Sequence, residues 1–155
     1  MTDFYQTVIN TARSCVGTPF LHQGRNKKTG LDCIGLVVVS LEAAGLKVHD
    51  RQDYSRRPDG KSIVNALEQH NAVKIADAPV SCDQIQRGDL LLFSYDNQIQ
   101  HIAIATSSST IIHSYATAKK VVETDIGSYW LRRLACVYRF SSVQNSGNWQ
   151  LETGN

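Results

Sequence analysis

The sequence lacks a long hydrophobic run, an excess of charge of one sign and any close pair of cysteines. Its longest apolar stretch, residues 34–39, includes a glycine and is far too short to cross a bilayer, so no membrane partner is expected. The 16 Lys and Arg residues nearly balance the 14 Asp and Glu residues, which argues against a nucleic-acid-binding surface. The N-terminus has neither a basic region nor a continuous apolar core, so no signal peptide is predicted.

The four cysteines are spread widely along the chain: Cys15, Cys33, Cys82 and Cys136. Zinc sites usually have ligands at short spacings such as C-x-x-C, and a chain of this length does not need disulfides to fold. We therefore expect free thiols and no structural metal. Cys15, Cys82 and Cys136 are expected to be inert, and Cys33 has a context of its own.

The apolar pattern has helical spacing first and strand alternation later. Residues 3–15, 32–45 and 60–71 are predicted to be helices, and residues 20–31 a loop. Six strands are expected at 73–75, 89–94, 100–106, 110–115, 119–124 and 134–140. This order predicts an α+β fold in which N-terminal helices pack on an antiparallel sheet of about five to six strands. Residues 1–140 are expected to form one domain, followed by a polar, poorly ordered tail at 141–155.

Cys33 follows Asp32, a good N-cap, and so lies in the first turn of the most apolar predicted helix. Free backbone N–H groups and the helix dipole stabilise a thiolate at that position, which favours a nucleophilic cysteine. Asp32 is itself negative and would oppose the thiolate, so its expected role is capping. The alternative is that Cys33 is a small buried apolar residue near a helix start.

A nucleophilic cysteine needs a base, and the strand pattern selects two of the five histidines. If residues 107–109 form the loop between two strands, Ala103 pairs with His113, and His101 becomes a diagonal neighbour of His113 on the same face. This arrangement suits a base, His101, that is oriented by a second ring, His113. The alternative is a purely structural pair of cross-strand histidines.

Other polar residues are expected on the solvated surface, and they are His49, His70, Arg25, Lys27, Lys28, Arg56, Arg57, Arg132 and Arg133. Tyr95 and Tyr115 are candidates for the wall of a groove, because Tyr115 shares a strand face with His113.

Five segments together resemble a known family. Residues 30–37 read Gly-Leu-Asp-Cys-Ile-Gly-Leu-Val, which resembles the Asp-Cys-Ser-Gly-Leu/Phe-Val signature of the NlpC family of cell-wall cysteine peptidases. Residues 17–20, 88–90, 101–104 and 111–114 match other motifs of that family in order and spacing. The resemblance spans residues 5–140 and implies a reduced papain-like fold. It implies Cys33 as nucleophile, His101 as base and His113 as third polar residue, with no metal or organic cofactor.

The resemblance implies hydrolysis of an amide bond in peptidoglycan stem peptides, next to D-glutamate. Phe20 stands where the family usually has a tyrosine whose hydroxyl polarises the scissile carbonyl. The backbone N–H of Cys33 then needs a second donor, for which His22 and Gln23 are candidates. Asp32 and Tyr115 complete the residues expected around the substrate.

Residues 22–25, 130–133 and 137–140 are similar to the phage-encoded branch of the family, whose members are associated with tail tips. That similarity implies phage tail proteins as partners. The expected substrate lies outside the cytoplasm. The chain would therefore be made in the cytoplasm and delivered to the cell wall in a virion, by lysis or by specialised secretion.

Two alternatives stay open. The first is a phage tail component of the same fold that is catalytically weak or inactive, which the phenylalanine at position 20 favours. The second is a metallohydrolase whose ligands are His101, His113 and either Cys33 or Asp32.

Overall fold

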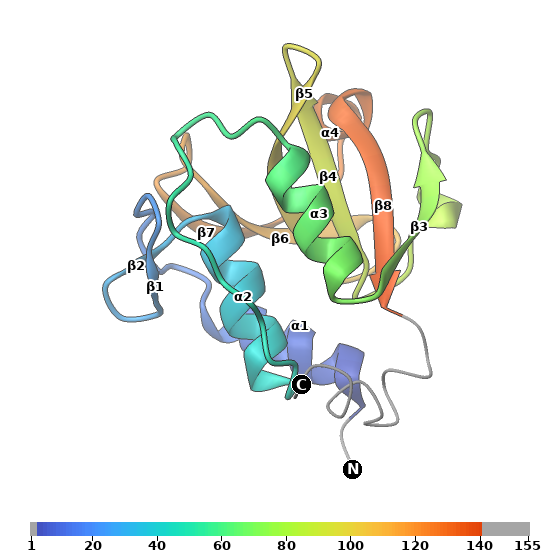
Figure 1. Cartoon of the computed structure of the whole chain (residues 1–155). Helices are drawn as coiled ribbons and strands as arrows, with labels where there is room; N and C mark the ends of the chain where they lie inside the picture. Colours follow the sequence, from blue (N-terminus) through green and yellow to red (C-terminus); the bar gives the residue numbers. More distant parts are fainter. Residues whose placement is uncertain (1–2, 141–155) are drawn as a thin grey trace.

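The computed structural model describes residues 3–140, which form four helices and eight strands (Figure 1). The helices are α1 (Phe4–Ser14), α2 (Cys33–Ala43), α3 (Lys61–Gln69) and α4 (Ser128–Arg133), with a 3-10 turn at Cys82–Gln84. The strands are β1 (Arg25–Asn26), β2 (Gly30–Leu31), β3 (Ala72–Asp77), β4 (Leu90–Tyr95), β5 (Gln98–Ala105), β6 (Thr110–Tyr115), β7 (Lys120–Asp125) and β8 (Leu134–Phe140). The tail expected at 141–155 lies outside the described residues, and no described helix has the length and apolarity needed to cross a bilayer.

Six strands form one antiparallel sheet in the order β3-β8-β4-β5-β6-β7. Its two faces bury separate cores, because side chains alternate along each strand. In β4, Leu90 and Leu92 pack in the core with α1, α2 and α3, whereas Leu91 and Phe93 pack with α4. Figure 1 shows α3 lying across one face of the sheet and α4 behind it. The predicted α+β fold, with N-terminal helices on a six-stranded antiparallel sheet, is confirmed.

One prediction about local structure was wrong, and one element was missed. Residues 20–31 are not all loop, since β1 and β2 form a small antiparallel pair. Helix α4 was not predicted at all. Both elements are too short to show a hydrophobic period, so only tertiary packing reveals them.

The predicted register of the hairpin β5–β6 is confirmed. Ile104 pairs with Ile112 and Ala105 with Ile111, as this register requires, whereas the described strands do not form the expected pair between Ala103 and His113. In the described part of the chain, the ladder ends at the pair Ile104–Ile112. The N-terminal part of β5, residues 98–103, and the C-terminal part of β6, residues 113–115, are not paired with each other.

The segment that leads into α2 lies between the parted strands. On the β6 side, Ser114 Oγ donates a hydrogen bond of 2.6 Å to the carbonyl oxygen of Leu31. On the β5 side, the backbone N–H of Ile102 lies near the Cys33 thiol and lowers its pKa. The first turn of α2 is therefore held against the sheet by both strands.

Glycine is required where α2 meets the loop before it. A Cβ atom on Gly35 would lie 2.0 Å from the carbonyl oxygen of Gly24, and backbone cannot give way by that much. This close approach fixes the loop of residues 20–31 beside the start of α2.

A buried ion pair joins β4 to β8. Asp89 is fully buried and accepts two hydrogen bonds of 2.7 Å from Arg139 and one of 2.8 Å from the backbone N–H of Gln86. The carboxylate is thus paired and fully hydrogen-bonded, as a buried charge must be.

Replacing Asp89 by Asn should lower the free energy of unfolding by about 2 kcal/mol, because Arg139 loses its partner in a partly buried setting. The matched control is Asp53→Asn, since Asp53 pairs with Arg51 in solvent, and we expect a change below about 0.5 kcal/mol. Urea unfolding of the three proteins measures both effects. Equal losses in the two variants would contradict the importance given to the buried pair.

Candidate active site

A cavity of about 290 Å³ brings Cys33 and His101 together. Five other residues selected from the sequence line it as well: Phe20, His22, Asp32, Tyr95 and Tyr115. His113 lies behind His101, and Gln23 does not line the cavity. The remaining wall comes from the segment after α2 and from the ends of β4, β6 and α4.

Cys33 is the first residue of α2, and Asp32 caps the helix by accepting a hydrogen bond of 2.7 Å from the N–H of Gly35. The predicted capping role of Asp32 is confirmed. Burial, together with the negative charge of Asp32, raises the pKa of the Cys33 thiol to about 12. Backbone N–H groups of Ile102 and Ile34 lower that pKa, but they do not outweigh burial. The expectation of a stabilised thiolate therefore does not hold for the free protein.

His101 and His113 form a direct pair. His101 Nε2 and His113 Nδ1 are 2.6 Å apart, and the ring centroids are 4.9 Å apart. Burial lowers the pKa of His101 to about 3, with a contribution from His113, and burial lowers the pKa of His113 to about 4. Both rings are therefore neutral at pH 7, and one donates a hydrogen bond to the other.

Aromatic side chains fix the orientation of both imidazoles. Trp130 stacks on His101 at 5.4 Å, and Tyr115 stacks on His113 at 5.3 Å with the ring planes within 8°. Phe93 contacts His101 from the neighbouring strand β4. Trp130 and Phe93 were not selected from the sequence. The only signal for Trp130 was its place in the segment 130–133.

Gln23 does not act as the expected donor into the cavity. Its side-chain amide donates to the carbonyl oxygen of Tyr54 at 2.7 Å, and its backbone N–H donates to Asp32. His22 does line the cavity, with its ring edge to face with that of Tyr54. Phe20 lines the cavity without any polar atom to offer.

Asp32 has no free acceptor position. Oδ1 accepts from the N–H of Gly35 and from Arg25, and Oδ2 accepts from the N–H of Gln23 and from Tyr54. Four donors saturate a carboxylate, so Asp32 is not available to bind substrate or a metal ion. Residues 3–140 contain no group of three or more His, Cys, Asp or Glu side chains arranged to hold a metal ion, which leaves the metallohydrolase alternative without a ligand set there.

Of two residues expected on the surface, Arg25 is partly buried and His70 is buried. Arg25 has a side chain only 14% exposed and pairs with both Asp32 and Asp50. His70 is 5% exposed, and its Nε2 accepts a hydrogen bond from the backbone N–H of His49. Both assignments failed because loop 46–59 folds over these side chains, and its sequence has no periodicity to indicate that contact.

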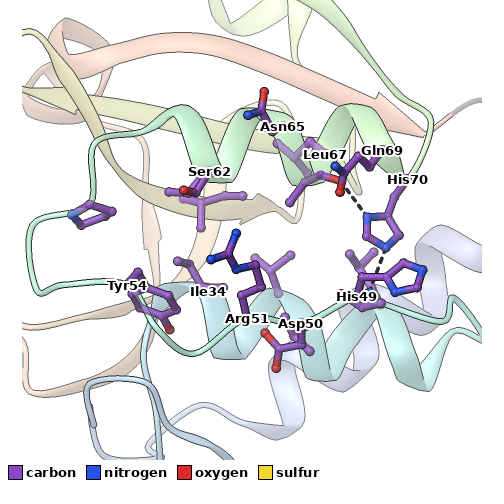
Figure 2. Close-up of a pocket in the computed structure, with 18 of the residues that line it drawn as sticks. Ile34, His49, Asp50, Arg51, Tyr54, Ser62, Asn65, Leu67, Gln69 and His70 are labelled. Atoms are coloured by element: carbon purple, nitrogen blue, oxygen red, sulfur yellow. Dashed lines mark hydrogen bonds between the residues drawn. The ribbon is translucent and has the colours of Figure 1, made fainter.

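A second cavity of about 300 Å³ lies between α2 and α3 (Figure 2). Tyr54 is at one end and His49 and His70 are at the other, as Figure 2 shows. The two cavities share Ile34, Tyr54 and Pro58 in their walls. Tyr54 is thus part of the boundary between them.

The buried histidine pair should make stability fall in acid. An unfolded histidine titrates near pH 6.5, whereas the folded pKa values are about 3 and 4, so the unfolded chain binds more protons between pH 6.5 and 4. The free energy of unfolding should therefore fall as the pH drops through this window. Each histidine contributes up to about 1.4 kcal/mol per pH unit.

The variant His113→Gln should reduce this slope by about 1 kcal/mol per pH unit, since one of the two titrating groups is gone. The matched control, His49→Gln, replaces an exposed ring and should keep the wild-type slope. Denaturant unfolding at several pH values provides the measurement. A slope unchanged in His113→Gln would mean that His113 is not held neutral by folding.

Comparison with known proteins places this geometry in a family. The NlpC/P60 family profile matches residues 17–139. The bifunctional muramidase/DL-endopeptidase CwlT of Bacillus subtilis strain 168 is 30% identical over 131 residues, which are 83% of this chain and 34% of CwlT. The chain thus spans about a third of the length of this curated relative.

Solved structures agree on the fold. The NlpC/p60 domain of the peptidoglycan hydrolase SagA has a TM-score of 0.61 at 20% identity, covering 88% of this chain and 98% of that one. RipD of Mycobacterium tuberculosis, described as a non-catalytic NlpC/p60 domain protein adapted to peptidoglycan binding, has a TM-score of 0.58 at 18% identity, covering 90% and 98%. With its papain-like α+β fold and a family match over most of its length, the chain belongs to the NlpC/P60 family.

Proposed function

We propose that this chain is a cysteine endopeptidase that hydrolyses an amide bond in peptidoglycan stem peptides, next to D-glutamate. The observation that carries the proposal is the joint placement of Cys33, at the start of α2, and the neutral His101 in one cavity. Family membership supports the reaction class, and CwlT, a DL-endopeptidase, supports the substrate.

The histidine pair determines which nitrogen acts as the base. His101 Nε2 faces His113 Nδ1, so a proton on His101 Nε2 that is donated to His113 leaves His101 Nδ1 unprotonated. In the described part of the chain, His101 Nδ1 makes no hydrogen bond, which leaves it available to the Cys33 thiol. His113 thus fixes the tautomer that a base requires.

The reaction then follows from a neutral thiol and a neutral imidazole. Cys33 Sγ attacks the scissile carbonyl carbon while its proton passes to His101 Nδ1. The same proton goes to the leaving amine as the C–N bond breaks, which leaves a thioester on Cys33. Water then attacks the thioester carbonyl, gives a proton to His101, and the thiol is re-formed as the acid leaves.

The oxyanion of the tetrahedral intermediate needs donors that Phe20 does not supply. We assign the backbone N–H of Cys33 and the ring of His22, because both belong to the cavity and the amide of Gln23 is engaged elsewhere.

A second candidate is a catalytically weak or inactive component of the same fold. The observation that favours it is the absence of a hydroxyl at Phe20, and RipD is a non-catalytic domain of this fold. The presence of Cys33, His101 and His113 in one arrangement favours the enzyme.

Delivery by a phage tail is a separate proposal, which rests on the resemblance of residues 22–25, 130–133 and 137–140 to phage-encoded members. It predicts that mass spectrometry detects the chain in purified virions from a culture that carries its gene. Its absence from virions, together with its presence in the growth medium before lysis, would favour secretion instead.

The test of the enzyme is digestion of purified peptidoglycan by the wild-type protein and by Cys33→Ala. Wild type should release stem-peptide fragments, and the variant should release none above background, because the nucleophile is missing. Mass spectrometry of the soluble products identifies the cleaved bond.

Cys82→Ala is the matched control, since Cys82 is also half-buried but lies in the 3-10 turn away from the cavity. It should digest peptidoglycan like the wild type. Identical digests from wild type and Cys33→Ala, with folded proteins and several wall types, would leave the inactive tail component as the better hypothesis. Activity lost in EDTA but retained in iodoacetamide would instead favour the metallohydrolase.

A further inference from the structure

The proposed nucleophile has a negative neighbour. Asp32 is 3% exposed and directly precedes Cys33, so its charge acts through a poorly solvated region and disfavours the thiolate. A helix cap does not need this charge, because Asn or Ser caps a helix as well as Asp does. Something in the structure must therefore offset it.

Arg25 is the only cation with a hydrogen bond to Asp32 among the described residues. Its Nη1 lies 3.1 Å from Asp32 Oδ1, while its Nε and Nη2 bind Asp50 at 2.8 and 3.1 Å. Arg25 is thus shared between two carboxylates. A second hydrogen-bond donor to Asp32 would therefore help to offset the charge of this carboxylate.

Tyr54 provides that donor. Its hydroxyl lies 2.5 Å from Asp32 Oδ2, and its ring lies under the guanidinium of Arg25 at 5.5 Å. The amide of Gln23 holds the backbone of Tyr54 in place. Tyr54 belongs to loop 46–59 and Arg25 to β1, so two segments distant in sequence meet on the Asp32 carboxylate.

We propose that Arg25 and Tyr54 are positioning residues of the active site, which together hold Asp32 as the cap of α2 and offset its charge beside the Cys33 thiolate. The proposal rests on the proposed function only in taking Cys33 as the nucleophile. Neither residue needs to touch substrate to act, because both act through Asp32.

Besides Asp32 and Tyr54, the cavity that holds the thiol is lined by other groups that titrate or carry charge, and they are His22, Arg56, Tyr95, His101, Tyr115 and Tyr129. A shift in one variant alone would therefore not identify its route. A variant that also removes the charge of Asp32 identifies the cause of the shift. If the shift depends on this carboxylate, it disappears when the charge is removed.

The experiment measures the rate of Cys33 alkylation by iodoacetamide against pH, read by mass spectrometry of the Cys33 peptide. Arg25→Met should raise the apparent thiol pKa by at least about one unit, which slows alkylation about tenfold at a fixed pH below that pKa. Tyr54→Phe, which keeps the ring between the two cavities and removes one oxygen atom, should slow it about threefold. Arg25→Lys, which keeps the charge, should lie between wild type and Arg25→Met.

The decisive variant is Arg25→Met with Asp32→Asn. It keeps a helix cap and removes the charge, so alkylation should return to the wild-type rate or exceed it. If Arg25 were merely structural, this double variant would react no faster than Arg25→Met, and the proposal would be overturned. An unchanged rate in Tyr54→Phe would remove Tyr54 from the proposal.

Arg51→Met is the control, because the Arg51 side chain pairs only with exposed Asp53 in the described chain and should leave the profile unchanged. Circular dichroism checks the folding of every variant. If Arg25→Met does not fold, the alkylation profile of Tyr54→Phe tests the proposal instead. The measurement needs no peptidoglycan. Shifted profiles without wall digestion would refute the proposed function and leave the charge compensation standing, whereas digestion with unshifted profiles would refute only the compensation.

Discussion

The structure depends on the separation of β5 and β6 beyond Ile104, which makes room for the start of α2 inside the sheet. The chain that enters α2 contacts both parted strands, at the Ser114 hydroxyl of β6 and beside the backbone N–H of Ile102 in β5. The same opening places Cys33 beside the strand that carries His101. Fold and site therefore have one geometric origin, because a fully paired sheet would leave neither a cavity nor a place for the helix start.

Burial in this opening determines the charge state of the resting site. It raises the pKa of the Cys33 thiol and lowers the pKa values of His101 and His113, so the free protein holds a neutral thiol and neutral rings. A neutral thiol beside a neutral imidazole carries no net charge that water or salt must stabilise. In the proposed mechanism, proton transfer from sulfur to His101 accompanies attack on the substrate, and the fixed dipoles of the α2 N-terminus stabilise the charge that forms.

The sequence predicted the parts of the site that follow a local rule. Asp32 before Cys33 is a helix-start pattern, and the three serines after β5 set the register that brings His113 beside His101. Contacts made by irregular segments could not be predicted, because residues 46–59 have no period that indicates their position. The burial of Arg25 by that segment is a long-range event, and so is the stacking of Trp130 from a six-residue helix.

The regular elements and the irregular loop 46–59 affect the reactivity of Cys33 in different ways. The sheet and α2 position Cys33 and His101, whereas the charge balance around Asp32 depends on loop 46–59, which contains no helix or strand. Such a segment opens more easily than the core does, since fewer buried contacts hold it. When it opens, Asp32 loses Tyr54, and Arg25 loses Asp50 as a partner, while the nucleophile and base keep their places. The sheet and α2 thus hold Cys33 and His101 in place, whereas the charge balance around Asp32 depends on Asp50 and Tyr54 of this loop.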